Sequence, residues 1–262
     1  MKLVNLGCGK RYHPEWINVD FYSDVPEVMA HDLSGGIPFQ DESFDVVYHS
    51  HLIEHFSKTG ALRFMKDCYR VLKTHGIIRV VAPDLERIVQ NYQKYLTLAL
   101  EGDLTAEANY DWILLEMYDQ TVRNFSGGEM AKYLQQEDLV NEDFICQRIG
   151  AEGKNIRKYF LENKTPDSPI SANYLNDAIN RKNKNESETF SQIGKFRLSG
   201  EIHQWMYDRF SLTRLLQTSG FNSTIIRKAD ESYIPGWKNF LLDTETDGSA
   251  YKPDSIFIEG IK

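Results

Sequence analysis

The chain has 262 residues, of which 41% are hydrophobic and 26% charged, a composition typical of globular proteins and unlike that of disordered or collagen-like chains. Its 38 acidic residues outnumber its 30 basic ones, and the resulting net charge of −8 disfavours non-specific binding to nucleic acid. The three cysteines form no metal-binding or disulfide pattern, and no leader or membrane-spanning stretch is present. We therefore expect a cytoplasmic protein with a small-molecule partner, no nucleic acid and no structural metal. Its oligomeric state stays open.

Four short apolar segments in the first 86 residues are typical of buried strands, at 3–7, 16–20, 44–49 and 77–82. Between the last two, apolar residues recur at helical spacing from Ala61 to Leu72, and His75-Gly76 predicts the end of that helix. A strand, a helix and a strand in this order indicate a parallel sheet.

The middle of the chain changes character. Helical spacing continues over 87–101 and 107–123 with no strand between them, and the polar segment 163–196 predicts a surface loop. After it, the pattern predicts a helix near Ser211 and two further strands at 222–227 and 255–261.

These elements together predict an α/β fold, with a Rossmann-like, doubly wound and mostly parallel sheet. We assign the sheet domain to residues 1–86 and 200–262, and a mainly helical insertion to residues 87–199.

The first strand runs directly into Gly7-Cys8-Gly9, a turn that exposes backbone N–H groups at the edge of a parallel sheet where ligands bind. Tyr12 stands where a dinucleotide-binding fingerprint needs its third glycine, and no triphosphate-binding loop occurs, so NAD and ATP are both disfavoured. Asp20 ends the second strand, where its carboxylate can accept two hydrogen bonds from a ribose. We interpret Cys8 as a small turn residue rather than a nucleophile.

An ordered set of short motifs then follows. Taken together, this set resembles the class I S-adenosylmethionine-dependent methyltransferases over roughly residues 1–86: Gly7-Cys8-Gly9, Asp20, Asp32-Leu33, PFQDESFD at 38–45, SHLIEH at 50–55 and YRVLK at 69–73. Residues 200–262 are also similar to these enzymes.

The resemblance implies S-adenosylmethionine as the cofactor and assigns residues to it. Gly7, Cys8 and Gly9 would face its methionine part, and Asp20 would hold its ribose. Asp32 and Leu33 would flank its adenine, Phe21 would stack nearby, and Ser50 would line the same edge. One feature departs from the family: only 11 positions separate Gly9 from Asp20, so the helix that normally crosses between the first two strands must be shortened to a turn or lost.

Residues 51–55 read H-x-x-E-H, a pattern that in other contexts binds zinc. A second alternative is a structural histidine pair that bonds backbone carbonyls and Glu54. We take the catalytic interpretation further, because a hydroxyl that attacks a methyl group must lose its proton and histidine suits that task. His51 is the candidate base, and Glu54 and His55 would share a helical face with it and orient it, with His55 as the second catalytic candidate.

Three more residues are candidates for substrate binding. Asp84 follows a predicted strand as a helix cap or a substrate contact, and His203 and Trp205 stand where the chain re-enters the sheet domain. The insertion would cover the acceptor site. The predicted function is methyl transfer to an unidentified acceptor, with a small molecule or a glycan hydroxyl favoured. The alternative is a non-catalytic adenosyl-ligand-binding or scaffold protein on the same fold.

Overall fold

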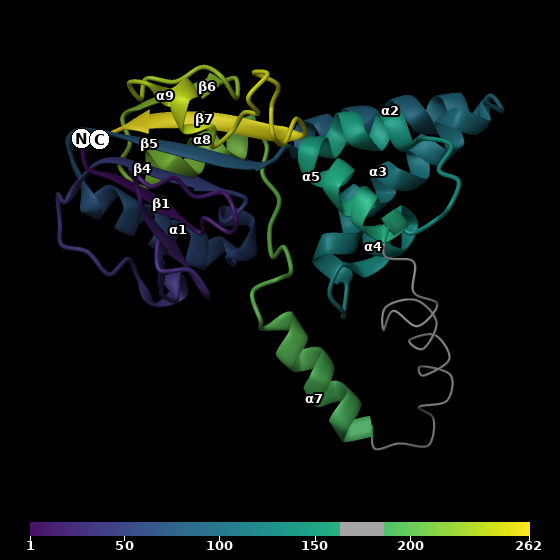
Figure 1. Cartoon of the computed structure of the whole chain (residues 1–262), viewed down its shortest axis with the longest axis horizontal. Helices are drawn as coiled ribbons and strands as arrows, with labels where there is room; N and C mark the ends of the chain where they lie inside the picture. Colours follow the sequence, from purple (N-terminus) through teal and green to yellow (C-terminus); the bar gives the residue numbers. More distant parts are fainter. Residues whose placement is uncertain (163–185) are drawn as a thin grey trace. The chain divides into compact units, whose positions relative to one another are not determined.

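A computed structural model describes residues 1–162 and 186–262 (Figure 1). By its contacts the chain divides into two units, one made of Met1–Arg87 with Gln204–Lys262 and the other of Ile88–His203. The predicted surface loop at 163–196 lies outside the described residues as far as residue 185. Beyond that the loop prediction is wrong, because Glu186–Arg197 form helix α7. The sequence offered a signal for this helix, since Phe190, Ile193 and Phe196 recur at helical spacing.

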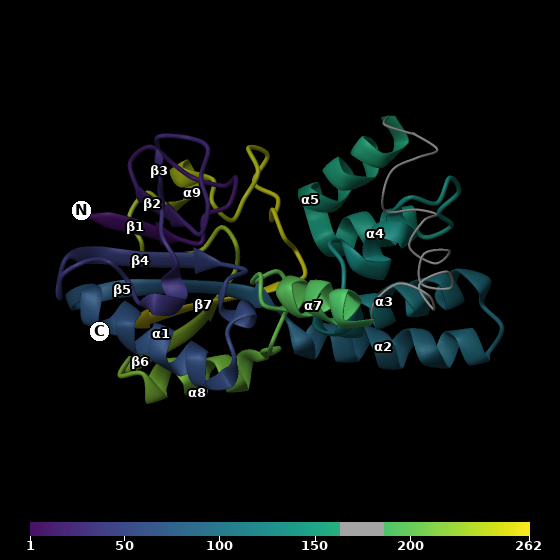
Figure 2. The ribbon, with the colours of Figure 1, turned by 90° about the horizontal axis from the view of Figure 1, so that it is seen from below.

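The described residues of the first unit form a seven-stranded sheet with the order β3-β2-β1-β4-β5-β7-β6. Neighbouring strands from β3 to β5 are parallel, and β7 runs antiparallel to both β5 and β6. This arrangement confirms the predicted α/β, mostly parallel sheet (Figure 2). The strands are β1 (Leu3–Leu6), β2 (Ile17–Asp20), β3 (Val28–Ala30), β4 (Phe44–Ser50), β5 (Leu72–Pro83), β6 (Ser223–Arg227) and β7 (Ser255–Ile261).

Strand order positions the ligand edge. From β1 the chain adds β2 and β3 on one side and then returns to add β4 on the other, so the order reverses between β1 and β4. The carboxyl ends of parallel strands at such a reversal are where open α/β sheets bind ligands. The glycine turn follows β1 and therefore lies at this point.

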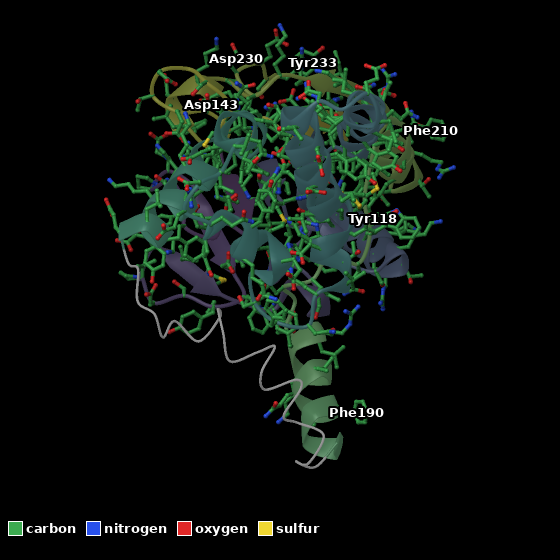
Figure 3. The ribbon with its side chains drawn as sticks, turned by 90° about the vertical axis from the view of Figure 1, so that its right-hand side faces the viewer. Tyr118, Asp143, Phe190, Phe210, Asp230 and Tyr233 are labelled. Carbon is green, nitrogen blue, oxygen red and sulfur yellow. The ribbon has the colours of Figure 1, made fainter. Side chains whose placement is uncertain are left out.

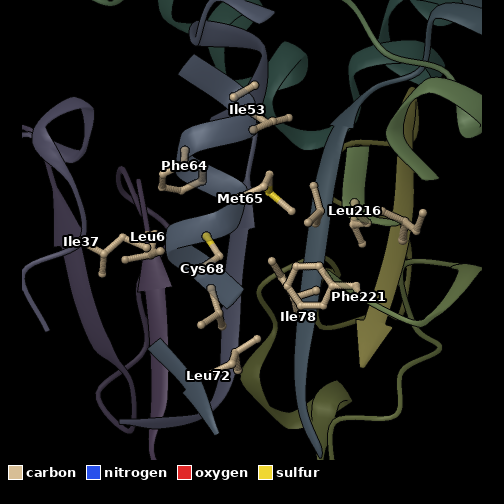
Figure 4. Close-up of a cluster of buried hydrophobic side chains, with 14 of the residues drawn as sticks. Leu6, Ile37, Ile53, Phe64, Met65, Cys68, Leu72, Ile78, Leu216 and Phe221 are labelled. Carbon is tan, nitrogen blue, oxygen red and sulfur yellow. The ribbon is translucent and has the colours of Figure 1, made fainter. Parts of the chain in front are cut away.

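One face of the sheet is covered by α1 (Lys58–Val71) and α8 (Arg209–Thr218). Figure 4 shows Phe64, Met65 and Cys68 of α1 facing the strands that carry Leu6 and Ile78. Each such side chain is almost fully buried and contributes roughly 1.5–3 kcal/mol on leaving water. These buried contacts hold α1 against the sheet.

Helix α1 ends earlier than predicted. Ser57 caps its start by accepting a 3.1 Å hydrogen bond from the N–H of Gly60, but the helix stops at Val71 and not at His75-Gly76. Leu72 already belongs to β5 and pairs with Phe44 of β4. The apolar Val71-Leu72 pair is buried in the core, and this tertiary pairing outweighs the local glycine signal.

The connection from β1 to β2 contains no helix in its described residues, as the short spacing predicts. Arg11, in this connection, instead reaches a distant segment. Its guanidinium lies 4.0 Å from the ring centroid of Tyr251 and donates a 2.9 Å hydrogen bond to Glu245. A second donor of Arg11 binds the carbonyl of Thr244. Residues 244–251 thus hold the turn in place where a crossover helix would otherwise pack.

The other sheet face buries an ionic network. Arg79 of β5 is fully buried and donates hydrogen bonds to Asp243 at 2.7 Å and to Glu259 at 3.0 Å. The hydroxyl of Tyr48 donates to the second oxygen of Asp243 at 2.6 Å, and the ring of Trp237 from α9 (Trp237–Phe240) lies 4.5 Å from the Arg79 guanidinium. Every charge in this cluster has a partner, so the network ties β5 and β7 to the segment before β7.

The second unit is helical in its described residues. A buried Glu116 accepts hydrogen bonds from the indole of Trp112 at 2.6 Å and from Arg148 at 2.5 Å, which joins α3 to α5. Tyr118 and Phe190 are exposed (Figure 3).

No helix in the described part of the chain combines the length and apolar composition that a membrane crossing requires. The described helices of the second unit are α2 (Leu85–Leu100), which begins in the first unit, α3 (Leu104–Val122), α4 (Gly128–Leu134), α5 (Glu142–Glu162) and α7.

Candidate functional site

The glycine turn is bonded to the end of β2. The backbone N–H groups of Gly7 and Cys8 both donate to the carbonyl of Val19, at 2.8 and 3.2 Å. The N–H of Gly9 donates to Oδ2 of Asp20 at 2.5 Å. Gly7 and Gly9 have φ values of +67° and +52°, in the left-handed region that favours glycine. The chain therefore needs glycine here for its backbone path alone.

The two glycines differ in the space beside them. A Cβ at Gly7 would lie 2.9 Å from the side chain of Leu52, whereas a Cβ at Gly9 would meet nothing within 4 Å. Gly7 is thus required for packing between β1 and the segment after β4. Gly9 borders open space next to the Asp20 carboxylate, and a ligand can approach the backbone there.

Asp20 is half-buried and directs both oxygens toward backbone donors, since Oδ1 accepts a 2.7 Å hydrogen bond from the N–H of Phe21. Each carboxylate oxygen can accept a second bond, so capacity for ribose hydroxyls remains. The side chain of Phe21 is 68% exposed, as a stacking platform would be. Ser50 ends β4 and is half-buried.

The predicted adenine pair divides into two environments. Asp32 is exposed and caps a short 3₁₀ helix, accepting a 2.9 Å bond from the N–H of Ser34; the hydrogen bonds from Ser34 lower its pKa. The side chain of Leu33 belongs to the hydrophobic core instead, so only its backbone is available to a ligand.

Cys8 is buried at the turn. Burial, reinforced by the negative charge of Asp20, raises the pKa of its thiol to about 12. A thiol that stays protonated at neutral pH is a poor nucleophile, which agrees with the prediction of a small turn residue.

His51 follows β4 with its backbone at φ +50°, and its N–H donates to the carbonyl of Val81 at 2.9 Å. Its Nε2 lies 2.7 Å from the hydroxyl of Ser255, the first residue of β7. Its Nδ1 lies 3.4 Å from Oε1 of Glu54. Non-glycine residues rarely adopt this backbone region, and those that do concentrate at functional sites.

The shared helical face predicted for His51, Glu54 and His55 is wrong. The left-handed backbone of His51 and the non-helical Leu52 interrupt any helix, and only Ile53–His55 form a single 3₁₀ turn. Glu54 nevertheless comes close to His51. His55 is half-buried, and its carbonyl accepts a 2.9 Å hydrogen bond from the side chain of Gln204.

The burial of Glu54 was not indicated by the sequence pattern. Its side chain is 1% exposed, and burial raises its pKa to about 8. Its backbone carbonyl accepts hydrogen bonds from the N–H groups of Gln204 at 2.7 Å and Trp205 at 3.2 Å, so the returning chain closes over it. A glutamate in the H-x-x-E-H motif was visible in the sequence, but its burial was not.

The substrate candidates take separate positions. Asp84 is 8% exposed and caps the start of α2, accepting a 3.0 Å bond from the N–H of Glu86, which is the capping alternative. Trp205 is 42% exposed in the first unit, with the ammonium of Lys58 5.1 Å from its ring. His203 belongs to the second unit, where its N–H donates to the carbonyl of Gln120 at 2.9 Å.

A family model described as a methyltransferase domain matches residues 20–80. This match confirms the resemblance to class I S-adenosylmethionine-dependent methyltransferases and supports S-adenosylmethionine as the cofactor. A search of curated proteins matches none of them to this chain.

Several solved structures are similar in fold. One is an S-adenosylmethionine-dependent methyltransferase from Thermotoga maritima, described as a possible histamine N-methyltransferase, at 12% identity and a TM-score of 0.42 over 100% of this chain and 82% of that chain. Another, from Archaeoglobus fulgidus, has 13% identity and a TM-score of 0.39 over 100% and 86%. A Haloferax volcanii methyltransferase in complex with the Trm112 activator has 10% identity and a TM-score of 0.39 over 99% and 81%.

The residues present fit the implied cofactor on two independent observations. The open space beside Gly9 lets a ligand reach the turn, and the half-buried Asp20 carboxylate retains acceptor capacity for a ribose.

Proposed function

We propose that this chain, which matches the methyltransferase domain and resembles the class I enzymes, transfers a methyl group from S-adenosylmethionine to an acceptor hydroxyl of a small molecule or glycan. The observation that carries the proposal is the hydrogen bond between the N–H of Gly9 and the carboxylate of Asp20, at the point where the strand order reverses. This arrangement supports a ligand that has a diol at one end, for Asp20, and at the other end a part that approaches the glycine turn closely.

Gly7 and Gly9 would admit the methionine part, Asp20 would bind the ribose hydroxyls, and Phe21 and Asp32 would lie toward the adenine. When bound, S-adenosylmethionine supplies a methyl group on a positively charged sulfur. The chain's own contribution is then to align the acceptor and to exclude water, since alignment supplies much of the rate in a direct displacement.

His51 is the proposed base for a hydroxyl acceptor. Its imidazole is 15% exposed, so it can be reached from outside the core. Its Nε2 lies 2.7 Å from the hydroxyl of Ser255, and an unprotonated Nε2 would take the proton of an acceptor hydroxyl. We assign acceptor choice to the second unit, Ile88–His203, because the methyltransferase motifs all lie outside it.

Calorimetry with the purified full chain tests the cofactor. S-Adenosylmethionine and its demethylated product are expected to bind, and NAD and ATP are not. Gly9→Val is the variant expected to weaken binding, because its side chain would fill the open space beside Asp20 and strain the left-handed turn. Equal affinity of the variant and the natural chain would contradict the assignment.

Transfer of tritium from labelled S-adenosylmethionine into fractionated small molecules and glycans then tests catalysis. Labelled product that depends on the natural Gly9 supports the enzyme. Tight donor binding without transfer to any fraction would favour the non-catalytic alternative.

A further inference from the structure

We propose that Ser255, His51 and Glu54 form one line of polar contacts in which Glu54 is a positioning residue whose protonation decides which nitrogen of His51 carries the proton. The catalytic consequence rests on the proposed function, but the line itself does not. Nothing in the methyl-transfer assignment requires Glu54, which touches neither the glycine turn nor Asp20 through any hydrogen bond in the described chain.

The Ser255 end of the line is rigid. Ser255 is 2% exposed, pairs with Pro83 across the β5–β7 ladder, and lies 2.7 Å from Nε2 of His51. Two sheet-bound segments therefore hold the imidazole, one through this hydroxyl and one through the hydrogen bond from its own backbone to Val81. A hydroxyl both donates and accepts, so it tolerates either state of Nε2.

The Glu54 end is buried and under-bonded. Its side chain is 1% exposed, and neither carboxylate oxygen meets a hydrogen-bond donor of standard geometry among the described residues. Nδ1 of His51 lies 3.4 Å from Oε1 of Glu54. A buried carboxylate without donors is costly, so Glu54 keeps its proton to higher pH, in line with a pKa of about 8.

Two arrangements satisfy this line. With Glu54 neutral, its O–H donates to Nδ1, and the imidazole carries its proton on Nε2, which donates to Ser255. With Glu54 ionised, it accepts from Nδ1–H, and the lone pair on Nε2 accepts from Ser255. The second arrangement has one proton fewer, and that proton passes to solvent. Only this arrangement offers an unprotonated Nε2 to an acceptor hydroxyl, so ionised Glu54 is the state that supports a base.

Other titratable groups act on Glu54 in opposite directions. The positive charge of Lys252 favours ionisation, whereas Asp254 opposes it. Burial, and after it the negative charge of Glu54, raises the pKa of Tyr207 to about 12. His51 and His55 lie three positions before and one position after Glu54 in the chain. His203 directly precedes Gln204, whose N–H donates to the carbonyl of Glu54. Substitutions of Lys252 and Asp254 therefore provide a test, because they should shift the titration midpoint of Glu54 in opposite directions.

Long-range proton–nitrogen NMR spectra of the full chain, labelled with ¹⁵N-histidine and free of any ligand, report the tautomer directly. His51→Gln identifies the His51 signals among the seven histidines. From pH 6.5 to 9.5, His51 is expected to change from the Nε2–H to the Nδ1–H form with a midpoint near pH 8. In Glu54→Gln this change should be absent. Lys252→Met should move the midpoint up, and Asp254→Asn should move it down.

One constant tautomer over this range, an unchanged transition in Glu54→Gln, or midpoints of Lys252→Met and Asp254→Asn that move in the same direction would each overturn the inference. The signals of the other histidines show whether each variant is folded. If Glu54→Gln fails to fold, the two charge variants decide alone.

Where a labelled acceptor is found, kcat should rise with pH through the same midpoint and move with it in Lys252→Met and Asp254→Asn, with KM for the donor unchanged. If Glu54 had a purely structural role, its substitution would lower activity without moving the pH range over which kcat rises. Failure of methyl transfer would leave the tautomer result standing, and methyl transfer without the tautomer change would remove only this inference.

Discussion

The backbone N–H of Gly9 and the Oδ2 atom of Asp20 lie 2.5 Å apart and are hydrogen-bonded, although no helix connects β1 to β2 in this fully described segment. Asp20 therefore shapes the glycine turn, in addition to its proposed role of binding the ribose. Substitutions of Asp20 must be chosen to separate these tasks.

Asp20→Asn should retain an oxygen that accepts from Gly9 but lose the charge. Asp20→Ala loses both. We expect the affinity for S-adenosylmethionine to fall by about 10-fold in Asp20→Asn and by roughly 30- to 100-fold in Asp20→Ala, because charge-assisted hydrogen bonds are worth about 1.5–3 kcal/mol. Calorimetry measures both values, and thermal melting shows how far each variant disturbs the turn. Donor affinity in Asp20→Ala equal to that of the natural chain would exclude Asp20 from the site.

Replacement of His51 by Ala is expected to lower kcat by about 100-fold or more on a hydroxyl acceptor, while donor affinity stays within a few-fold. His55→Ala should have a smaller effect, because His51 and not His55 is the proposed base. Steady-state kinetics with labelled donor separate kcat from KM. A His51→Ala enzyme with natural kcat places the base elsewhere.

Glu54 should make the folded state less stable as pH rises. Its carboxyl pKa increases from 4.5 to about 8 on folding, so between these pH values the folded chain binds more protons than the unfolded chain and its stability falls as pH rises. Integrated from pH 6 to 9, the loss is about 2–3 kcal/mol. The Glu54→Gln side chain cannot ionise, so this variant should not lose this stability. Between about pH 6 and 9, its free energy of unfolding should therefore rise by this amount relative to that of the natural chain. Urea unfolding at several pH values measures the difference, and parallel curves would contradict the prediction.

His49 should act in the opposite direction, on the acid side. It is fully buried in β4, and burial lowers its pKa to about 3. Because the unfolded chain takes up a proton near pH 6.5 and the folded chain does not, stability falls by about 2 kcal/mol between pH 7 and pH 5. His49→Leu should remove this loss.

The exposed His75 supplies the control for His49. His75→Asn keeps a residue that tolerates the left-handed backbone of this position, at φ +64°, and removes a histidine that is not buried. It should leave the acid-side slope of stability unchanged. Equal slopes in His49→Leu and the natural chain would mean that His49 is protonated in the folded state.

Arg79 tests the buried ionic network. Arg79→Met would remove the buried cation that binds Asp243 and would leave Glu259 with Arg227 as its remaining ion pair among the described residues, and breaking such a buried pair costs about 3–5 kcal/mol. The matched control is Lys238→Met, which removes the exposed ion pair with Asp230 and should cost less than about 1 kcal/mol. Chemical unfolding compares the two. A cost for Arg79→Met no larger than that of Lys238→Met would show that the network does not stabilise the sheet.

The sequence by itself determined the features that depend on neighbouring residues. Short apolar segments predicted six of the seven strands in the described sheet, all except β3 (Val28–Ala30), and a buried parallel strand is apolar over its whole length. The Gly7-Cys8-Gly9 turn and Asp20 were identified from local patterns, since a strand end and a glycine turn are properties of a few consecutive residues. The loss of the first crossover helix also followed from chain length alone.

Only the tertiary structure decided the surroundings of His51. Its partner Ser255 lies 204 positions away and reaches it because β7 inserts antiparallel beside β5. The local helix predicted for residues 51–55 did not form, since the contacts of His51 across the sheet hold a left-handed backbone there. Burial of Glu54 likewise depends on a distant segment, as Gln204 and Trp205 close over it. Strand order and burial are set by the whole core, and protonation follows from burial, so no local pattern contains them.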